Sequence, residues 1–210
     1  MGRPALLAAL LLAGCGDGPA VETASDAAPN PETSLPPAGT GGAADQAGAR
    51  PATDTAVVVL EGDEEAVALR LVRYPDLPAP FSTYLPDGWA EETVASGEGS
   101  AVRFTMGEPP FHALLSVSFP SGGAASAQAQ AQAVLDGAGD VRELTDPEPW
   151  VAFGRSFVRD GSYGSVRVGE HAGVPFVVLE EVPFDMGDGF YPRVGLVLDR
   201  LRWLDTGAGL

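Results

Sequence analysis

The chain has 210 residues, of which 29 are acidic and 12 are basic, so its formal net charge at pH 7 is −17. A surface of this charge repels the phosphates of nucleic acids and of anionic lipid headgroups, so we exclude both as expected partners. Cys15 is the only cysteine, so the chain cannot form an intramolecular disulfide. An unpaired cysteine in an exported protein indicates some other role for its thiol.

The N-terminus carries the pattern of a secretory signal. Arg3 is the only charge before residues 5–13, which are all apolar, and the small residue Gly14 precedes Cys15. A membrane-spanning helix needs about 20 apolar residues, so this run is too short to cross a bilayer. The alternative is a buried helix of a cytosolic domain, which the basic start and the small residues disfavour. The pattern therefore predicts export from the cytoplasm.

Residues 12–15, Leu-Ala-Gly-Cys, resemble the lipobox of bacterial lipoproteins. The resemblance implies that residues 1–14 are a signal peptide that is removed, and that Cys15 is the lipid attachment site at the new N-terminus. Acyl chains on Cys15 supply a membrane anchor, because each buried methylene contributes about 0.8 kcal/mol. Gly16 rather than an aspartate follows the cysteine, which by the same resemblance favours the outer membrane or cell surface over the inner membrane.

Residues 15–55 are predicted to form a disordered linker behind the lipidated cysteine. Beyond Cys15 the segment is rich in alanine, glycine, proline and acidic residues, and Val21 and Leu35 are its only large apolar residues. Such a segment cannot bury enough apolar surface to offset the entropy lost on ordering. We expect it to act as a spacer between the membrane and a folded domain.

Residues 56–210 have the length of a single domain. Continuous or alternating apolar residues predict strands over residues 56–60, 81–85, 102–106 and 115–119. Residues 66–72 are expected to pair with the first of these strands through a turn at 61–64, although a helix that starts at Asp63 also fits the sequence.

The second half of the domain is predicted to contain a helix, a hairpin and a second helix. Residues 124–135 favour a helix because alanine and glutamine are strong helix formers. Residues 163–170 and 174–182 predict a hairpin, and residues 175–179 are apolar on both faces, which is typical of a central, covered strand. Residues 150–158 fit a helix or a strand.

A closing helix is predicted over residues 190–203, because its apolar residues recur at helical spacing. Pro192 is expected near its start, where the missing N–H is harmless, and Arg200 and Arg202 in its last turn, where they complement the helix dipole. The order of strands, helix, strands and helix predicts an α+β fold with a mainly antiparallel sheet.

Part of the domain resembles the PsbP and Mog1-like fold. The resemblance rests on residues 81–89 (Phe-Ser-Thr-Tyr-Leu-Pro-Asp-Gly-Trp), on the hairpin through residues 169–171 and on the closing helix that ends at Trp203. It covers about residues 78–206 and implies an antiparallel sheet flanked by helices, an α/β/α sandwich. It also implies a scaffold or protein-interaction role more than catalysis, and it transfers no functional residue.

Asp185 and Asp188 lie in a glycine-rich segment whose hard oxygen ligands suit Ca²⁺. The twelfth position of an EF-hand loop starting at Asp185 is Leu196 rather than a carboxylate, so the favoured interpretation is a polar loop in which Asp188 caps the last helix. His171 is expected to be an exposed turn residue and His112 to bond locally, and no cofactor is expected.

Five aromatic residues are candidates for a groove that binds a sugar or a peptide, although aromatic side chains more often fill a core: Trp89, Trp150, Tyr163, Tyr191 and Trp203.

The sequence thus favours a non-enzymatic, lipid-anchored lipoprotein of the cell envelope that presents its domain to a protein partner or a small ligand. The alternative is a carboxylate- or Ca²⁺-dependent extracytoplasmic hydrolase, which predicts acidic residues gathered in one cleft. A third interpretation is a purely structural module of an envelope complex.

Overall fold

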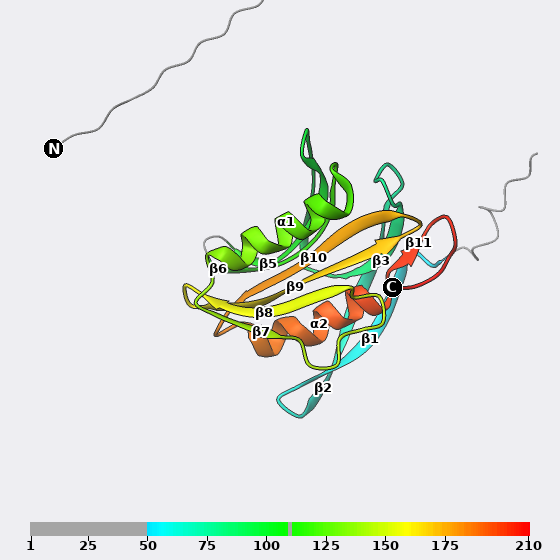
Figure 1. Cartoon of the computed structure of the whole chain (residues 1–210). Coiled ribbons are helices and arrows are strands. Elements are labelled where there is room, and N and C mark those ends of the chain that lie inside the picture. The colour runs from blue at the N-terminus through cyan, green and yellow to red at the C-terminus, as the bar shows by residue number, and fades with distance from the viewer. Residues whose placement is uncertain (1–49, 109–110) are drawn as a thin grey trace, which may run out of the picture. The chain divides into compact units, whose positions relative to one another are not determined.

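The computed structural model describes residues 50–108 and 111–210 (Figure 1). The predicted signal peptide, Cys15 and nearly all of the predicted linker lie outside the described residues.

The described residues form eleven strands and two helices. In chain order these are β1 (Thr53–Leu60), β2 (Asp63–Tyr74), β3 (Phe81–Pro86), β4 (Ala90–Ser96), β5 (Gly99–Glu108), β6 (Phe111–Pro120), α1 (Gly123–Asp136), β7 (Asp140–Glu143), β8 (Phe153–Arg159), β9 (Ser162–His171), β10 (Val174–Pro183), α2 (Gly187–Asp199) and β11 (Arg202–Trp203).

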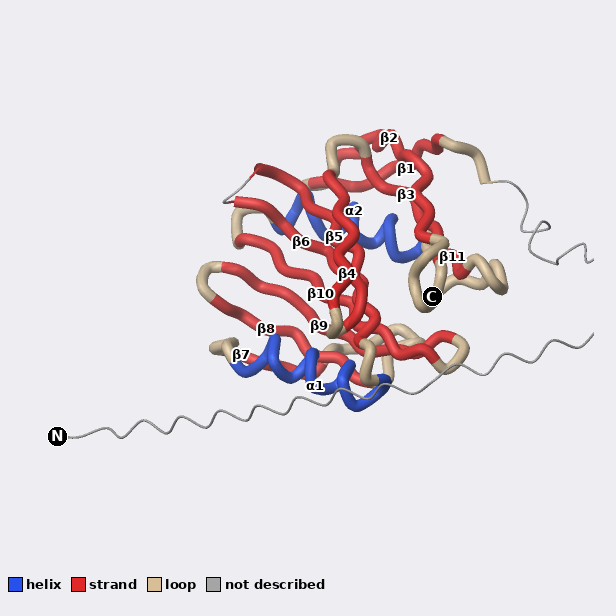
Figure 2. The backbone as a smooth tube through the Cα atoms, turned by 90° about the horizontal axis from the view of Figure 1, so that it is seen from above, coloured by secondary structure: helices blue, strands red, loops and turns tan. Residues whose placement is uncertain are grey.

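The strands are arranged in two antiparallel sheets. One has four strands in the order β1-β2-β3-β11, and the other has seven in the order β4-β5-β6-β10-β9-β8-β7. Helices α1 and α2 lie on opposite faces of the seven-stranded sheet (Figures 1 and 2). The predicted α+β class with a mainly antiparallel sheet is therefore confirmed.

Strand β10 has apolar side chains on both faces, and each face of the larger sheet is covered at this strand. Val177 packs under α1 with Ala127 and Ala131, whereas Val178 faces the other way, into the core shared with α2 and the smaller sheet. Because side chains alternate along a strand, a strand that is apolar at successive positions needs cover on both faces. The prediction of a central strand over residues 175–179 is confirmed.

The largest core lies between the two sheets and α2. Its fully buried members are mostly aromatic and aliphatic side chains from both sheets and from the helix, among them Phe81, Leu85, Phe104, Phe119, Phe176 and Phe190.

Most predicted elements are present with longer ends. The helix over residues 124–135 is α1, the hairpin over 163–182 is β9 and β10, and the ambiguous segment at 150–158 contains the strand β8. Residues 63–74 form a strand, so the alternative of a helix starting at Asp63 is wrong. This strand is held by β1 along its first part and by β3 along its last part.

The prediction for the last helix is wrong at both ends. Helix α2 ends at Asp199, so its last turn holds no basic residue. Arg202 instead belongs to β11 and donates from Nη1 to the carbonyl of Asp199 at 2.8 Å. Pro192 lies inside the helix, where it removes one backbone hydrogen bond. Asp188 is in the first turn, but the N-cap is Met186 without a side-chain bond, so Asp188 does not cap the helix.

Arg50, the first described residue, already contacts the folded domain, ahead of the expected start at residue 56. The Arg50 guanidinium donates from Nη1 to the hydroxyl of Ser82 at 2.9 Å and from Nη2 to the carbonyl of Arg200 at 2.8 Å. The same group lies over the ring of Tyr84, 4.6 Å from its centroid. Arg50 therefore joins β3 to the end of α2.

Candidate functional site

A cavity of about 680 Å³ lies between the two sheets. It opens where the end of β2 in the smaller sheet faces β4, the edge strand of the larger one. Its walls combine aliphatic and aromatic side chains with a few polar groups: Arg70, Leu71, Val72, Arg73, Tyr74, Pro75, Asp76, Leu77, Glu91, Thr93, Ala95 and Ser100. This is the composition of a small-molecule site.

A carboxylate on β4 binds two groups on β2 at this cavity. Arg70 donates from Nη1 to Oε1 of Glu91 at 2.7 Å, and the hydroxyl of Tyr74 donates to Oε2 of the same carboxylate. Arg70 also donates from Nη2 to the carbonyl of Trp89 at 3.3 Å. Because β2 and β4 belong to different sheets, Glu91 ties the two sheets together at the cavity.

The surroundings of Glu91 and Tyr74 fix their protonation states. Burial is the largest influence on Glu91 and raises its pKa, but the bonds from Tyr74 and Arg70 outweigh it, so the pKa of Glu91 lies below its usual range. Burial and the adjacent Glu91 raise the pKa of Tyr74 well above its ordinary value. The lowered pKa keeps Glu91 an anionic carboxylate at neutral pH, and the raised pKa keeps Tyr74 a neutral phenol.

Two further polar groups on the cavity wall are available to a ligand. The hydroxyl of Ser100 is buried and has no hydrogen-bond partner among the described residues, which leaves a polar group unsatisfied. Arg73 is an exposed side chain on the same wall, opposite Ser82 in the β2–β3 ladder. A molecule with an apolar body and a hydrogen-bonding or acidic group matches this lining.

Sequence reasoning missed this cavity. Tyr74 and Glu91 come from strands in different sheets, and β4 has no apolar alternation that would have revealed it as a strand. The only local hint of a polar site is the pair Glu91-Glu92 directly after the turn at residues 86–89. This pair does not indicate which residue of β2 would contact it.

The two most buried of the five predicted aromatic residues belong to the core. Trp89 is 5% exposed and stacks on Phe190 with a centroid separation of 5.5 Å. Trp203 is 3% exposed and packs against Phe176 at 5.3 Å. Neither side chain is available to a ligand in this arrangement.

The other three predicted aromatic residues are partly accessible. Trp150 lines a cavity of about 410 Å³ with Leu198 and Arg202. Tyr163 and Tyr191 lie with their rings nearly parallel, 5.7 Å between centroids, and line a separate pocket of about 310 Å³. The structure therefore brings Tyr163 and Tyr191 together and places the others elsewhere.

His171 is not the exposed turn residue that the sequence predicts. It is the last residue of β9, and its ring stacks on Trp203 with a centroid separation of 4.2 Å. Its Nε2 lies 2.9 Å from Oδ1 of Asp205, and the bond with His171 holds the pKa of Asp205 below its usual range. The segment after β11 therefore covers the imidazole, of which 14% is exposed.

The predicted calcium ligands gain no support from the part of the chain that the structure describes. Asp185 precedes α2 and Asp188 lies in its first turn, and the described residues contain no group of three or more histidine, cysteine or acidic side chains suited to a metal ion.

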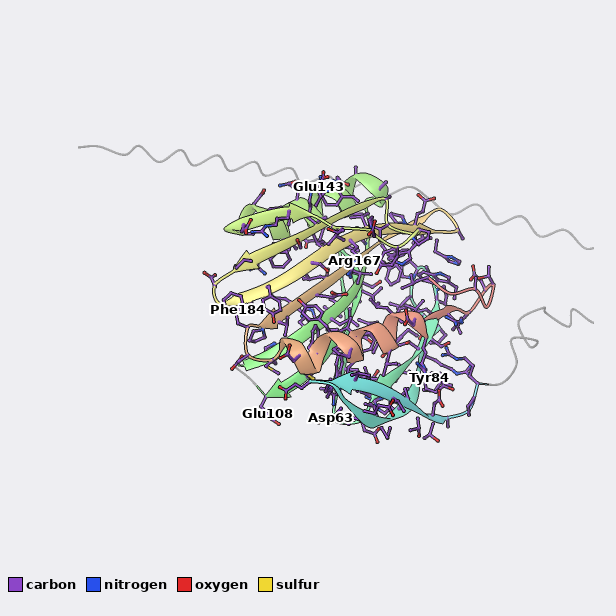
Figure 3. All side chains as sticks on the ribbon, turned by 90° about the horizontal axis from the view of Figure 1, so that it is seen from below. Asp63, Tyr84, Glu108, Glu143, Arg167 and Phe184 are labelled. Atoms are coloured by element: carbon purple, nitrogen blue, oxygen red, sulfur yellow. The ribbon has the colours of Figure 1, made fainter. Side chains whose placement is uncertain are left out.

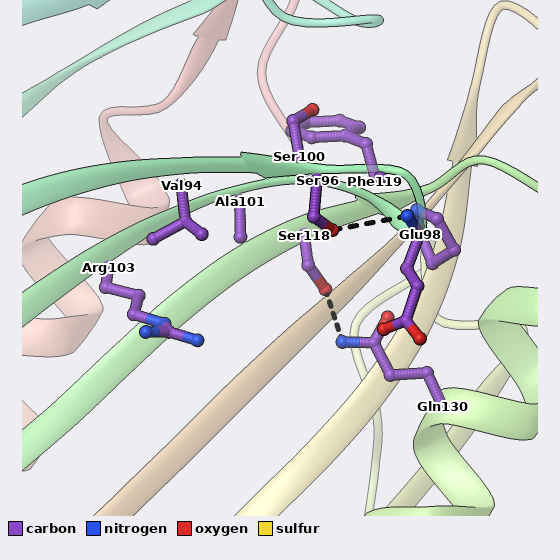
Figure 4. A pocket seen from close by; sticks show the side chains of 11 residues that line it. Val94, Ser96, Glu98, Ser100, Ala101, Arg103, Ser118, Phe119 and Gln130 are labelled. Carbon is purple, nitrogen blue, oxygen red and sulfur yellow. Dashed lines mark hydrogen bonds between the residues drawn. The ribbon is translucent and has the colours of Figure 1, made fainter.

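A second hollow lies on the outer face of β4, β5 and β6, beside α1 (Figure 4). It has a volume of about 230 Å³, and two of its polar side chains bond to each other, since Gln130 donates from Nε2 to the hydroxyl of Ser118 at 2.9 Å. The exposed His112 lines an adjoining hollow of about 370 Å³. These hollows are smaller than the inter-sheet cavity, and they lie on the wet face of a sheet.

Comparison with known proteins identifies no relative: neither a protein-family model nor a curated protein matches the chain. Within residues 50–108 and 111–210, neither helix has the length and apolar character needed to cross a membrane.

Proposed function

We propose that the protein is a lipid-anchored lipoprotein of the cell envelope, without enzymatic activity, whose domain binds a small ligand or a protein partner. The anchor is Cys15 in the lipobox-like sequence, and residues 15–55 hold the domain away from the outer membrane or cell surface. A PsbP or Mog1-like architecture is part of the proposal. It is supported by an antiparallel sheet with a helix on each face.

The inter-sheet cavity is the observation that carries the binding role. Its volume of about 680 Å³ lies within the range of small-molecule sites, roughly 300–1,000 Å³. Leu71, Val72 and Leu77 supply apolar contact, and Arg73 and Ser100 supply hydrogen-bond donors at the wall. The ligand we propose is therefore a largely apolar small molecule with one acidic or hydrogen-bond-accepting group.

The test uses the full-length protein expressed in a bacterial host and purified from membranes with detergent. Mass spectrometry of the intact protein should show that residues 1–14 are absent and that Cys15 carries acyl chains. Native mass spectrometry of the same sample should show a co-purifying small molecule. The variant Ala95→Trp, which adds an indole at the cavity wall, should lose this molecule without losing the acyl chains.

A matched control places the same bulk away from the cavity, at the exposed Val59 on β1 (Val59→Trp), and should retain the ligand. An intact N-terminus with an unmodified Cys15 would remove the anchor from the proposal. A ligand that is retained equally by Ala95→Trp would show that the cavity is not its site.

A further inference from the structure

A row of polar side chains crosses four strands on the α2 side of the larger sheet. Arg142 on β7 lies opposite Ser156 on β8, Ser156 opposite Ser165 on β9, and Ser165 opposite Glu180 on β10. Directly paired residues of an antiparallel sheet project to the same face, so these four side chains share one face. Figure 3 shows this side of the molecule, with Arg167 labelled beside the row.

The row runs from solvent into the interior. The side chain of Arg142 is 76% exposed, whereas that of Glu180 is 3% exposed. Glu180 accepts hydrogen bonds from Nη1 of Arg167 at 2.5 Å and from the hydroxyl of Ser165 at 3.1 Å. Nε of Arg167 is buried and makes no hydrogen bond among the described residues, although it lies 3.6 Å from Oε2 of Glu148.

Stability does not explain this pair. A buried ion pair is on average no more stabilising than well-packed apolar residues of the same volume, because both charges lose their hydration. The unsatisfied N–H of Arg167 adds a further penalty. We therefore look for a role of this polar row in recognition, where hydrogen bonds from buried charged groups are strong and directional.

Two aromatic rings stand over the same part of the sheet. Tyr163 and Tyr191 line the 310 Å³ pocket together with Asp140 and with Arg142 and Ser156 from the outer end of the row. Tyr191 is 39% exposed, so a ligand can reach its ring. Gly187 makes room for Tyr163, because a Cβ at residue 187 would collide with the tyrosine hydroxyl.

The charged side chains that line the pocket form one balanced pair. Nη2 of Arg142 lies 2.6 Å from Oδ2 of Asp140. A site of this kind attracts neither an anion nor a cation strongly, but it offers donors and acceptors next to aromatic surface. Sugars combine hydroxyl groups, which both donate and accept, with a C–H face that packs on an aromatic ring.

We propose that this pocket is a saccharide site, in which sugar hydroxyls bond to the Arg142–Asp140 pair and Ser156 while the sugar face packs on Tyr191. Asp140 and Arg142 lie on the edge strand β7, and the proposal places the sugar against the side chains on the face of this strand, not along its unpaired backbone. The pocket shares no lining residue with the inter-sheet cavity. The saccharide proposal can therefore be tested independently of the function proposed above.

The test is saturation-transfer difference NMR on the full-length protein with four pentasaccharides: cellopentaose, chitopentaose, maltopentaose and mannopentaose. At least one should receive saturation, and titration of that sugar should shift the tyrosine ring resonances. Tyr191→Ala should weaken binding about tenfold, the loss expected for one aromatic contact of about 1.4 kcal/mol. Arg142→Ala should weaken it by a similar factor, and Val59→Ala, a truncation of an exposed residue on β1, should not change it.

Both site variants change exposed side chains, so they are expected to fold, and their circular dichroism spectra should match that of the natural protein. The proposal is overturned if none of the four sugars receives saturation. It is equally overturned if a sugar binds but Tyr191→Ala and Arg142→Ala bind it as well as the natural protein does.

Discussion

The hydroxyl of Tyr74 on β2 donates to the carboxylate of Glu91 on β4, and this bond connects the four-stranded sheet to the seven-stranded sheet. The same carboxylate holds Arg70, so one acidic residue joins two side chains of the opposite sheet at the mouth of a cavity. The stability of the sandwich should therefore respond to the charge of Glu91.

Replacing Glu91 by glutamine should destabilise the domain by about 1 kcal/mol at pH 7, because two bonds to a charged acceptor become weaker. The pKa of Glu91 is lowered in the folded state, so its contribution is fully present above the unfolded-state pKa and is lost as the pH falls through the folded-state value. Urea unfolding of both proteins should show a difference at pH 7 that shrinks below about pH 4.

Glu92→Gln is the control for this experiment, since Glu92 is 67% exposed and lies 3.7 Å from Arg103. Its effect should be within about 0.5 kcal/mol. Equal effects of the two substitutions at pH 7 would contradict the special role of Glu91.

Replacing Arg50 by alanine should destabilise the domain by about 1–3 kcal/mol, because hydrogen bonds to Ser82 and Arg200 and the contact with Tyr84 are lost together. Arg73→Ala removes the same charge from an exposed position across the ladder from Ser82 and should have little effect. Thermal unfolding followed by circular dichroism distinguishes the two. A melting temperature of Arg50→Ala equal to that of Arg73→Ala would show that Arg50 does not hold the domain.

The buried Arg167–Glu180 pair should make the stability effects of substitutions at the two residues non-additive. Glu180→Gln alone should cost about 1–3 kcal/mol, because Arg167 loses its nearest counter-charge and keeps only Glu148, whose Oε2 lies 3.6 Å from Nε. The double variant with leucine at both positions should recover most of this loss, because an apolar pair needs no hydration. Urea denaturation of the two variants tests this, and a double variant as unstable as Glu180→Gln would indicate that the pair itself stabilises the fold.

Two glycines of α2 should respond in opposite directions to the same substitution. Gly187→Ala should destabilise by about 1–3 kcal/mol, because the added methyl group collides with the hydroxyl of Tyr163. A Cβ at Gly195 meets no atom within 4 Å, so Gly195→Ala should stabilise the helix by about 0.5–1 kcal/mol. Differential scanning calorimetry should therefore give melting temperatures on either side of the natural value, and a shift in the same direction for both would refute the packing argument.

The sequence predicts those elements whose side chains report their surroundings directly. The apolar residues of β10 identify a covered central strand, and the alanines and glutamines of α1 identify a helix. Strands β4 and β7 were missed because nearly all their side chains are exposed, so neither shows the alternation of buried and exposed residues that marks a strand. Each lies at an edge of the larger sheet, where one side of the backbone is unpaired.

The sequence does not predict either proposed site, because each depends on contacts between residues that are distant in the chain. Tyr74 meets Glu91, and Glu180 meets Arg167, through sheet register and the packing of one sheet on another. Local patterns contain no information on these long-range contacts. The sequence analysis names Tyr163 and Tyr191 among five candidate aromatic residues, but only the docking of α2 near β9 brings these two rings together.

The attachment of Arg50 has a mechanical consequence. Arg50 is the first residue that the structure describes, and its guanidinium binds both β3 and the end of α2, which are far apart in the sequence. A force applied at Arg50 is therefore shared between a strand and a helix, and the β1–β2 ladder that starts at Thr53 does not bear it alone.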